Sequence, residues 1–183
     1  KDFGNYNLII RPDQDVDRII TFTQAGGNGA SSGNFIIGLS NIALWSSIGT
    51  SKNITIDGFA IGGSTRRLTF QNQSTNNNAC KPIMVLGSTD NINIKNCILL
   101  DKTTGSSAFG AFTIRVRVES SVDYIPNNIT VDNCILSSVS STAAGIAITN
   151  SNTPTGRSVG LVFKNNKIEV KHRGISLNYS GTC

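Results

Sequence analysis

Two groups of basic side chains in this sequence have types and spacing suited to anion binding or to acid–base catalysis. The first is Arg115 and Arg117, which stand at alternate positions of an apolar, β-branched stretch. Both would point outward from one strand. Paired guanidinium groups can hold a carboxylate, such as that of a uronate sugar, or act as the basic group of a lyase. The alternative is a solvated strand in which Glu119 is a nearby ion partner.

The second group is Lys171, His172 and Arg173, which includes the only histidine of the chain. A histidine beside cations can act as a general base or help to bind phosphate or sulfate. A single histidine in a basic turn between strands is more often an ordinary surface residue. We therefore regard both groups as candidate ligand-binding residues, and we assign no catalytic residue.

A repeated segment supplies the elements that must position these side chains. Residues 91–100 are nearly copied at 128–136, with an earlier version at 53–61 and a later one at 160–168. The units begin 38, 37 and 32 residues apart, a period typical of repeat architectures. Apolar residues alternate with period two, which excludes helical repeats. Propeller blades fit this length, but no blade motif recurs, and a coil that winds once per unit explains the pattern better.

Aligning the units gives columns of equivalent residues. Three apolar columns, predicted to form stacked core layers, are Ile54, Ile92, Ile129, Leu161; Ile56, Ile94, Val131, Phe163; and Ile61, Leu99, Leu136, Ile168. The turn column is Gly58, Asn96, Asn133, Asn165. Glycine and asparagine tolerate a left-handed backbone, and stacked asparagines can hydrogen-bond from coil to coil.

The sequence therefore predicts one all-β domain over residues 1–183, a right-handed parallel β-helix of about five coils. Residues 1–33 would be a lead-in, with strands near residues 8 and 20, and residues 34–183 the repeating coils. We expect a strand over residues 111–118 and a polar insertion over residues 65–82. No amphipathic cap follows the last strand, so we expect the end to be truncated or covered by a partner.

The repeated unit Asn-Ile-Thr-Ile-x-Asn-x-x-Ile, preceded by Gly-Ile-x-Ile or its equivalent, resembles the right-handed β-helix of the pectate-lyase-like superfamily. The resemblance covers roughly residues 35–179. It implies the fold, but that superfamily includes polysaccharide lyases, glycoside hydrolases, epimerases, phage tailspikes and non-catalytic surface proteins. Its enzymes commonly place acidic residues on the outer face, to bind calcium or to act as acid and base.

One outward column of the repeat is charged and alternates in sign: Asp57, Lys95, Asp132 and Lys164. Stacked strands lie about 4.8 Å apart, so each carboxylate would have a cation above or below it. We interpret the column as a surface charge ladder, worth about 0.2–1 kcal/mol per pair. We expect no calcium at Asp57 or Asp132.

Cysteine spacing gives no indication of a metal site, because no CxxC or CxxH pattern is present. Cys97 and Cys134 share an inward column and are predicted to be stacked, inert core thiols, although a strained disulfide is geometrically possible. Cys80 and Cys183 lie outside the repeat, and their pairing is open. No cofactor is expected.

Composition narrows the possible partners. The net charge of +5 is compatible with acidic glycans or nucleic acid. Most aromatic residues fall in inward columns, so nucleic acid is not expected for lack of stacking platforms. No apolar run reaches the roughly 18 residues that span a bilayer.

We expect an extracellular structural, adhesin-like or glycan-binding segment of a larger surface or secreted protein. Its partners would be polysaccharide, or further coils or another chain at the C-terminal end. The alternative is a lyase or glycoside hydrolase acting on an acidic polysaccharide. That chemistry needs paired carboxylates in one cleft, or a basic residue beside calcium.

Overall fold

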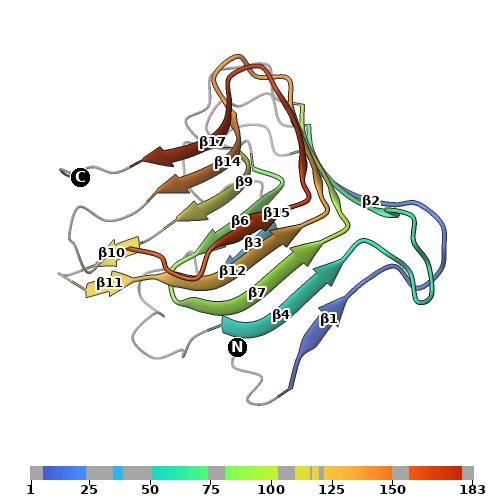
Figure 1. Ribbon diagram of the computed structural model, residues 1–183, viewed down its shortest axis with the longest axis horizontal. Helices are drawn as coiled ribbons and strands as arrows, with labels where there is room; N and C mark the ends of the chain where they lie inside the picture. Colours follow the sequence, from blue (N-terminus) through green and yellow to red (C-terminus); the bar gives the residue numbers. More distant parts are fainter. Residues whose placement is uncertain are drawn as a thin grey trace.

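The computed structural model describes residues 6–23, 35–38, 51–73, 81–102, 110–115, 117–119, 122–149 and 157–178. They form a parallel β-helix of five coils, in which each coil gives one strand to each of three sheets (Figure 1). The predicted fold class is confirmed. The described residues include no helix that is long and apolar enough to cross a membrane.

The three sheets are named here by their strands. Sheet A contains β1 (Leu8–Ile10), β4 (Ser51–Asp57), β7 (Thr89–Lys95), β12 (Pro126–Asp132) and β15 (Val162–Lys164). Sheet B contains β2 (Arg18–Phe22), β5 (Leu68–Asn72), β8 (Ile98–Asp101), β13 (Ile135–Ser138) and β16 (Lys167–Val170). Sheet C contains β3 (Phe35–Gly38), β6 (Ile83–Leu86), β9 (Gly110–Arg115), β14 (Ala144–Thr149) and β17 (Arg173–Asn178). An antiparallel hairpin of β10 (Arg117–Glu119) and β11 (Val122–Tyr124) follows the third coil.

Equivalent residues of successive coils face each other across parallel ladders. Ile54 pairs with Ile92, and Ile92 pairs with Ile129. Both partners of the second pair are fully buried. The first two predicted core columns are confirmed, and Leu8 and Ile10 of the lead-in extend them by one coil.

The third predicted core column is wrong at one position. Ile61 is 78% exposed, and its place is taken by Phe70, which is completely buried against Leu99 of the next coil. The reason is the connection between β4 and β5, which spans residues 58–67, whereas the later coils use two residues there. The segment predicted as a polar insertion therefore contains a regular strand, β5.

Two columns of residues adopt the left-handed backbone. Asn96, Asn133 and Asn165 have φ of 59°, 51° and 56°, in the predicted turn column. Nδ2 of Asn133 donates to Oδ1 of Asn96 at 2.8 Å, which links two coils. Gly58 shares the column for another reason: its φ is ordinary, but a Cβ there would lie 1.8 Å from the carbonyl oxygen of Asn96.

The second left-handed column lies within sheet A and was not predicted. Asn53, Asn91 and Asn128 have φ of 58°, 51° and 53°, and Gly160 continues the column at 67°. The backbone ladders skip these asparagines, so β4, β7 and β12 bend there (Figure 1). Nδ2 of Asn91 donates to Oδ1 of Asn53 at 2.8 Å, so the bends of neighbouring coils are joined.

Two cysteines stack on adjacent coils. Cys97 and Cys134 are fully buried and unbridged, and their thiols donate to the carbonyl oxygens of Lys95 and Asp132 at 3.2 and 3.4 Å. The hydrogen bond with Cys134, together with burial, raises the pKa of the Cys97 thiol. A protonated, enclosed thiol is a poor nucleophile. Cys80 and Cys183 lie outside the described residues.

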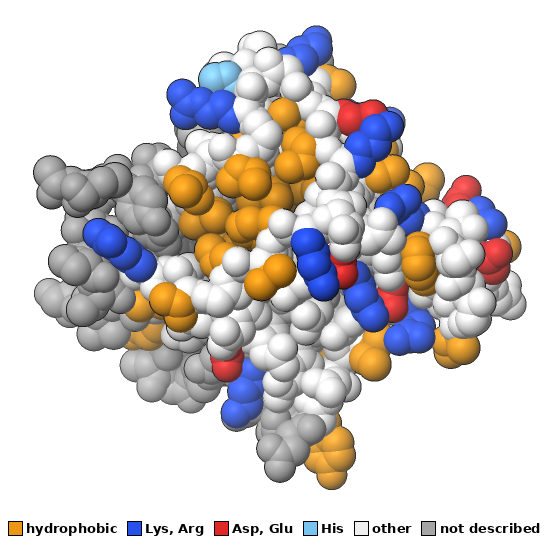
Figure 2. Space-filling view, in the orientation of Figure 1, with side chains coloured by type: hydrophobic (Ala, Val, Ile, Leu, Met, Phe, Trp, Pro, Cys, Tyr) orange, Lys and Arg blue, Asp and Glu red, His pale blue; other side chains and the backbone are white. Residues whose placement is uncertain are grey.

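The fifth coil leaves part of the core at the surface. Figure 2 shows a patch of hydrophobic side chains between the positions of β15 and β17. Ile175 and Leu177 of β17 are 48% and 58% exposed, although their partners in β14, Ile146 and Ile148, are buried.

Candidate functional site

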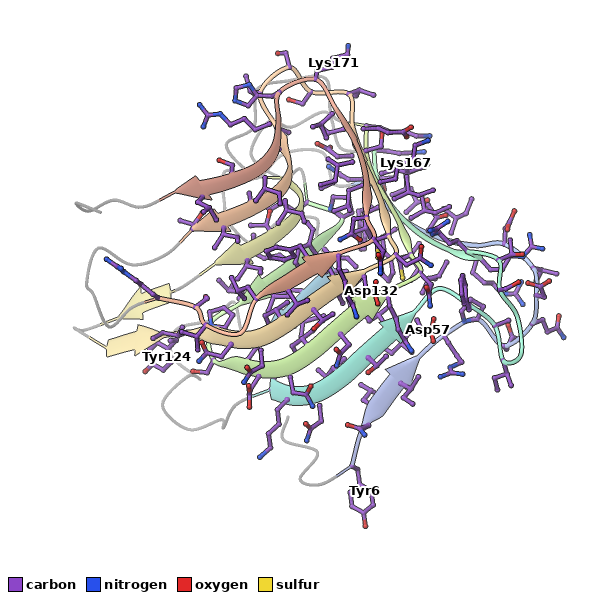
Figure 3. All side chains as sticks on the ribbon, in the orientation of Figure 1. Tyr6, Asp57, Tyr124, Asp132, Lys167 and Lys171 are labelled. Atoms are coloured by element: carbon purple, nitrogen blue, oxygen red, sulfur yellow. The ribbon has the colours of Figure 1, made fainter. Side chains whose placement is uncertain are left out.

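An open groove of about 420 Å³ runs across the outer face of sheet A. It is lined by Thr55, Asn93, Lys95, Thr130, Asp132 and Lys164. These residues come from four successive coils, and Figure 3 marks the region by Asp132. The groove therefore offers hydroxyl, amide, ammonium and carboxylate groups along the axis of the β-helix.

Strand alternation explains why these side chains share one face. In β7, Ile92 and Ile94 point into the core and are fully buried, so Asn93 and Lys95 point outward. The ladder then stacks Asn93 between Thr55 and Thr130. This hydroxyl and amide column was not predicted, although in the sequence it is the variable position between the two core residues of every unit.

The second column of the groove is charged, and two of the ion pairs that the predicted ladder requires are present. Nζ of Lys95 lies 3.2 Å from Oδ2 of Asp57, and Nζ of Lys164 lies 3.5 Å from Oδ2 of Asp132. Arg11 begins the column, with its Nη2 at 3.9 Å from Oδ2 of Asp57. The alternation of charge thus extends over all five coils.

Asp57 differs from the prediction, because it is buried rather than at the surface. Its Oδ1 accepts hydrogen bonds from Nδ2 of Asn96 at 2.8 Å and from the backbone N–H of Phe59 at 3.1 Å. Burial alone raises the pKa of Asp57, but these hydrogen bonds and the contact with Lys95 outweigh it. The pKa therefore lies below its ordinary value of 3.8.

This lowered pKa predicts a pH-dependent contribution to stability. Asp57 stabilises the folded chain fully above about pH 5, and the contribution is lost as the pH falls through 3.8 and below. Unfolding by urea at a series of pH values should show that Asp57→Asn is most destabilising near neutral pH. The difference in unfolding free energy from the unchanged chain should shrink in acid.

The matched control for this experiment is Asn93→Ala, an uncharged outward residue of the neighbouring column. Its effect on the free energy of unfolding should be the same at every pH. An Asp57→Asn effect that stays constant from neutral pH to pH 3 would contradict the assignment.

The groove contains a single carboxylate, that of Asp132, which is already engaged. Its Oδ2 pairs with Lys164, and its Oδ1 accepts a hydrogen bond from Nδ2 of Asn165 at 2.9 Å. Across the described part of the chain, no three His, Cys, Asp or Glu side chains converge as a metal site would need.

The basic residues proposed from sequence lie elsewhere. Lys171, His172 and Arg173 are exposed where β16 leads into β17, and Figure 3 shows Lys171 far from Asp132. The strand predicted over residues 111–118 divides: Arg115 ends β9, whereas Arg117 begins the β10–β11 hairpin. The two arginines thus do not share one strand, and their side chains lie outside the described set.

Comparison of the chain with protein-family models, with curated proteins and with solved structures found no match.

Proposed function

We propose that this protein is a non-catalytic extracellular β-helix segment, of adhesin-like type, that binds an acidic polysaccharide along the outer face of sheet A. The observation that carries the proposal is the composition of the groove. Thr55, Asn93 and Thr130 present hydrogen-bonding groups at successive coils, and Lys95 and Lys164 add positive charge.

The spacing of these groups favours a periodic ligand. Thr55, Asn93 and Thr130 recur at the strand spacing of about 4.8 Å, and the two ammonium groups lie two coils apart, on the order of 10 Å. A glycan chain laid along the axis would meet a hydroxyl or amide partner at each of these three coils. Its carboxylate or sulfate groups would meet the lysines.

One feature favours binding over catalysis. Glycoside hydrolysis uses two carboxylates that flank the scissile bond, whereas the groove supplies only Asp132, which is paired with Lys164. The resemblance of the repeat to the pectate-lyase-like superfamily supports an extracellular setting and a polysaccharide ligand, and that superfamily includes non-catalytic surface proteins.

Placing a negative charge in the groove tests this function. Thr130→Glu should weaken binding of an acidic polysaccharide, with polygalacturonate as the probe, by about tenfold, equivalent to roughly 1.4 kcal/mol. Isothermal titration calorimetry or affinity electrophoresis would measure the change. Thr130 is outward and only partly buried, so the substitution should leave the fold intact.

The control is Thr69→Glu, which places the same change on the outward face of sheet B. It should leave binding unchanged. Equal loss of polysaccharide binding in both variants would indicate a general charge effect. The groove would then not be the binding site. Release of new reducing ends or of unsaturated uronates by the unchanged chain would show instead that the protein is an enzyme.

A further inference from the structure

The charged column of the groove presents its signs in a fixed order along the axis of the β-helix. Lys95, Asp132 and Lys164 lie on consecutive coils, because Asp132 pairs in register with Lys95 on one side and with Lys164 on the other. All three line the groove, whereas Asp57, the carboxylate of the coil before, is buried. A ligand in the groove therefore meets a positive, a negative and a positive charge at successive steps of about 4.8 Å.

The two lysines of the groove can each bind an anion. Nζ of Lys95 contacts Oδ2 of Asp57 at 3.2 Å, and Nζ of Lys164 contacts Oδ2 of Asp132 at 3.5 Å. An ammonium group has three N–H donors, and the two lysine side chains are 41% and 56% exposed. Each lysine can therefore donate to a carboxylate or sulfate of a ligand while it keeps its ion pair within the protein.

Asp132 sets a different requirement at the coil between the two lysines. Its carboxylate pairs with Lys164 and accepts one hydrogen bond from Asn165. A carboxylate has about four acceptor sites, so further sites remain for the hydroxyl groups of a sugar. An acidic group of the ligand at the same level would be repelled, because like charges at neighbouring positions are destabilising. This coil therefore favours a neutral sugar.

The neighbouring column of the groove does not distinguish acidic from neutral sugars. Thr130 stands beside Asp132 on β12, as Asn93 stands beside Lys95 on β7. Hydroxyl and amide groups both donate and accept hydrogen bonds, so they can bind hydroxyl, acetamido or carboxylate groups of a sugar. Discrimination between acidic and neutral sugars therefore depends on the charged column.

We infer that the groove prefers a polysaccharide in which acidic and neutral sugars alternate, and that Asp132 is the residue that determines this specificity. The inference rests on the proposed function and names its ligand class more closely. An extended pyranose chain advances by roughly one strand spacing per sugar, so acids on every second sugar would reach both Lys95 and Lys164. In a polyuronate every sugar is acidic, and one acid would lie level with Asp132.

Two oligosaccharides of equal length test this specificity. Isothermal titration calorimetry would compare hyaluronan oligosaccharides, in which glucuronate alternates with neutral N-acetylglucosamine, with oligogalacturonates, which carry an acid on every sugar. The unchanged chain should bind the alternating oligosaccharide more tightly. Asp132→Asn keeps an oxygen that can accept from Asn165, and it should reduce the ratio of the two affinities about threefold by strengthening oligogalacturonate binding. A ratio that Asp132→Asn leaves unchanged would overturn the inference.

The matched control is Glu169→Gln, which removes the same charge from an exposed carboxylate of sheet B. Glu169 pairs with Lys167 at 2.7 Å, so this variant also leaves one lysine without its acidic partner. The affinity ratio should not change. An equal change of the ratio in both variants would overturn the inference, because net charge and not the position of Asp132 would then govern the preference.

A second measurement decides the point if Asp132→Asn fails to fold. Partly methyl-esterified oligogalacturonates have the same sugars but fewer acids, and the unchanged chain should bind them at least as tightly as the fully ionised form. Affinity that falls as the acids are esterified would overturn the inference and leave the proposed function standing. Binding of none of these oligosaccharides would overturn the proposed function, and this inference with it.

Discussion

Replacing Phe70 with alanine is expected to lower the free energy of unfolding by about 4 kcal/mol. Phe70 is completely buried, and its ring meets that of Phe35 edge to face at 5.2 Å between centroids. Truncation would remove this contact and leave a cavity between the second coil and its neighbours. Urea denaturation followed by circular dichroism would measure the loss.

The companion variant is Ile61→Ala. The repeat alignment places Ile61 in the core column that Phe70 occupies in the structure, but Ile61 is 78% exposed. We expect its substitution to change the free energy of unfolding by no more than about 0.5 kcal/mol. A larger loss for Ile61→Ala than for Phe70→Ala would show that the alignment, and not the observed register, describes the second coil.

Gly58→Ala should destabilise the chain by about 3 kcal/mol or more. A Cβ at this position would lie 1.8 Å from the carbonyl oxygen and 2.5 Å from the carbonyl carbon of Asn96. Both atoms belong to the backbone of the next coil, so no side chain can rotate away to make room. Thermal unfolding should show a lower midpoint, because β4 and β7 must separate locally.

Gly174→Ala is the matched control for Gly58→Ala. Gly174 is exposed, and a Cβ there would meet nothing within 4 Å. Its variant should unfold at the same temperature as the unchanged chain. If both variants behaved alike, close packing of coils at Gly58 would not be the reason for the glycine.

The repeat predicted the stacking of coils well, because a period near 38 residues and strict alternation leave few other folds. It failed where one coil differs in length. The connection over residues 58–67 displaces the second strand of that coil, β5. In the sequence, the two buried apolar residues of β5, Leu68 and Phe70, are flanked by polar residues, so the strand is not evident. Alignment by equal spacing cannot locate such an insertion.

The left-handed asparagines illustrate a second limit. Asn96 and Asn133 stand beside a turn, where the residue type itself indicates the conformation. Asn53, Asn91 and Asn128 precede β-branched residues and read as ordinary strand residues. Their positive φ depends on the bend that sheet A needs to follow the coil, which is a property of the stacked structure and not of any one unit.

The candidate site was predicted only in part. Charge alternation is visible in the sequence, so the column of Asp57, Lys95, Asp132 and Lys164 could be proposed. The burial of Asp57 could not, because it depends on the side chains of Asn96 and Arg11 from neighbouring coils. Thr55, Asn93 and Thr130 form a common surface only when the coils stack in register.

The alternating column also bears on the order in which the coils assemble. The segments at 91–100 and 128–136 are so similar that a nascent coil has two nearly equivalent templates. If β4 stacked directly on β12, Asp57 would face Asp132, and if β7 stacked on β15, Lys95 would face Lys164. Stacking of consecutive coils instead places opposite charges in contact, as in the observed pairs. Like charges would therefore face each other in a folding intermediate in which one coil has been skipped, and their repulsion would destabilise that intermediate.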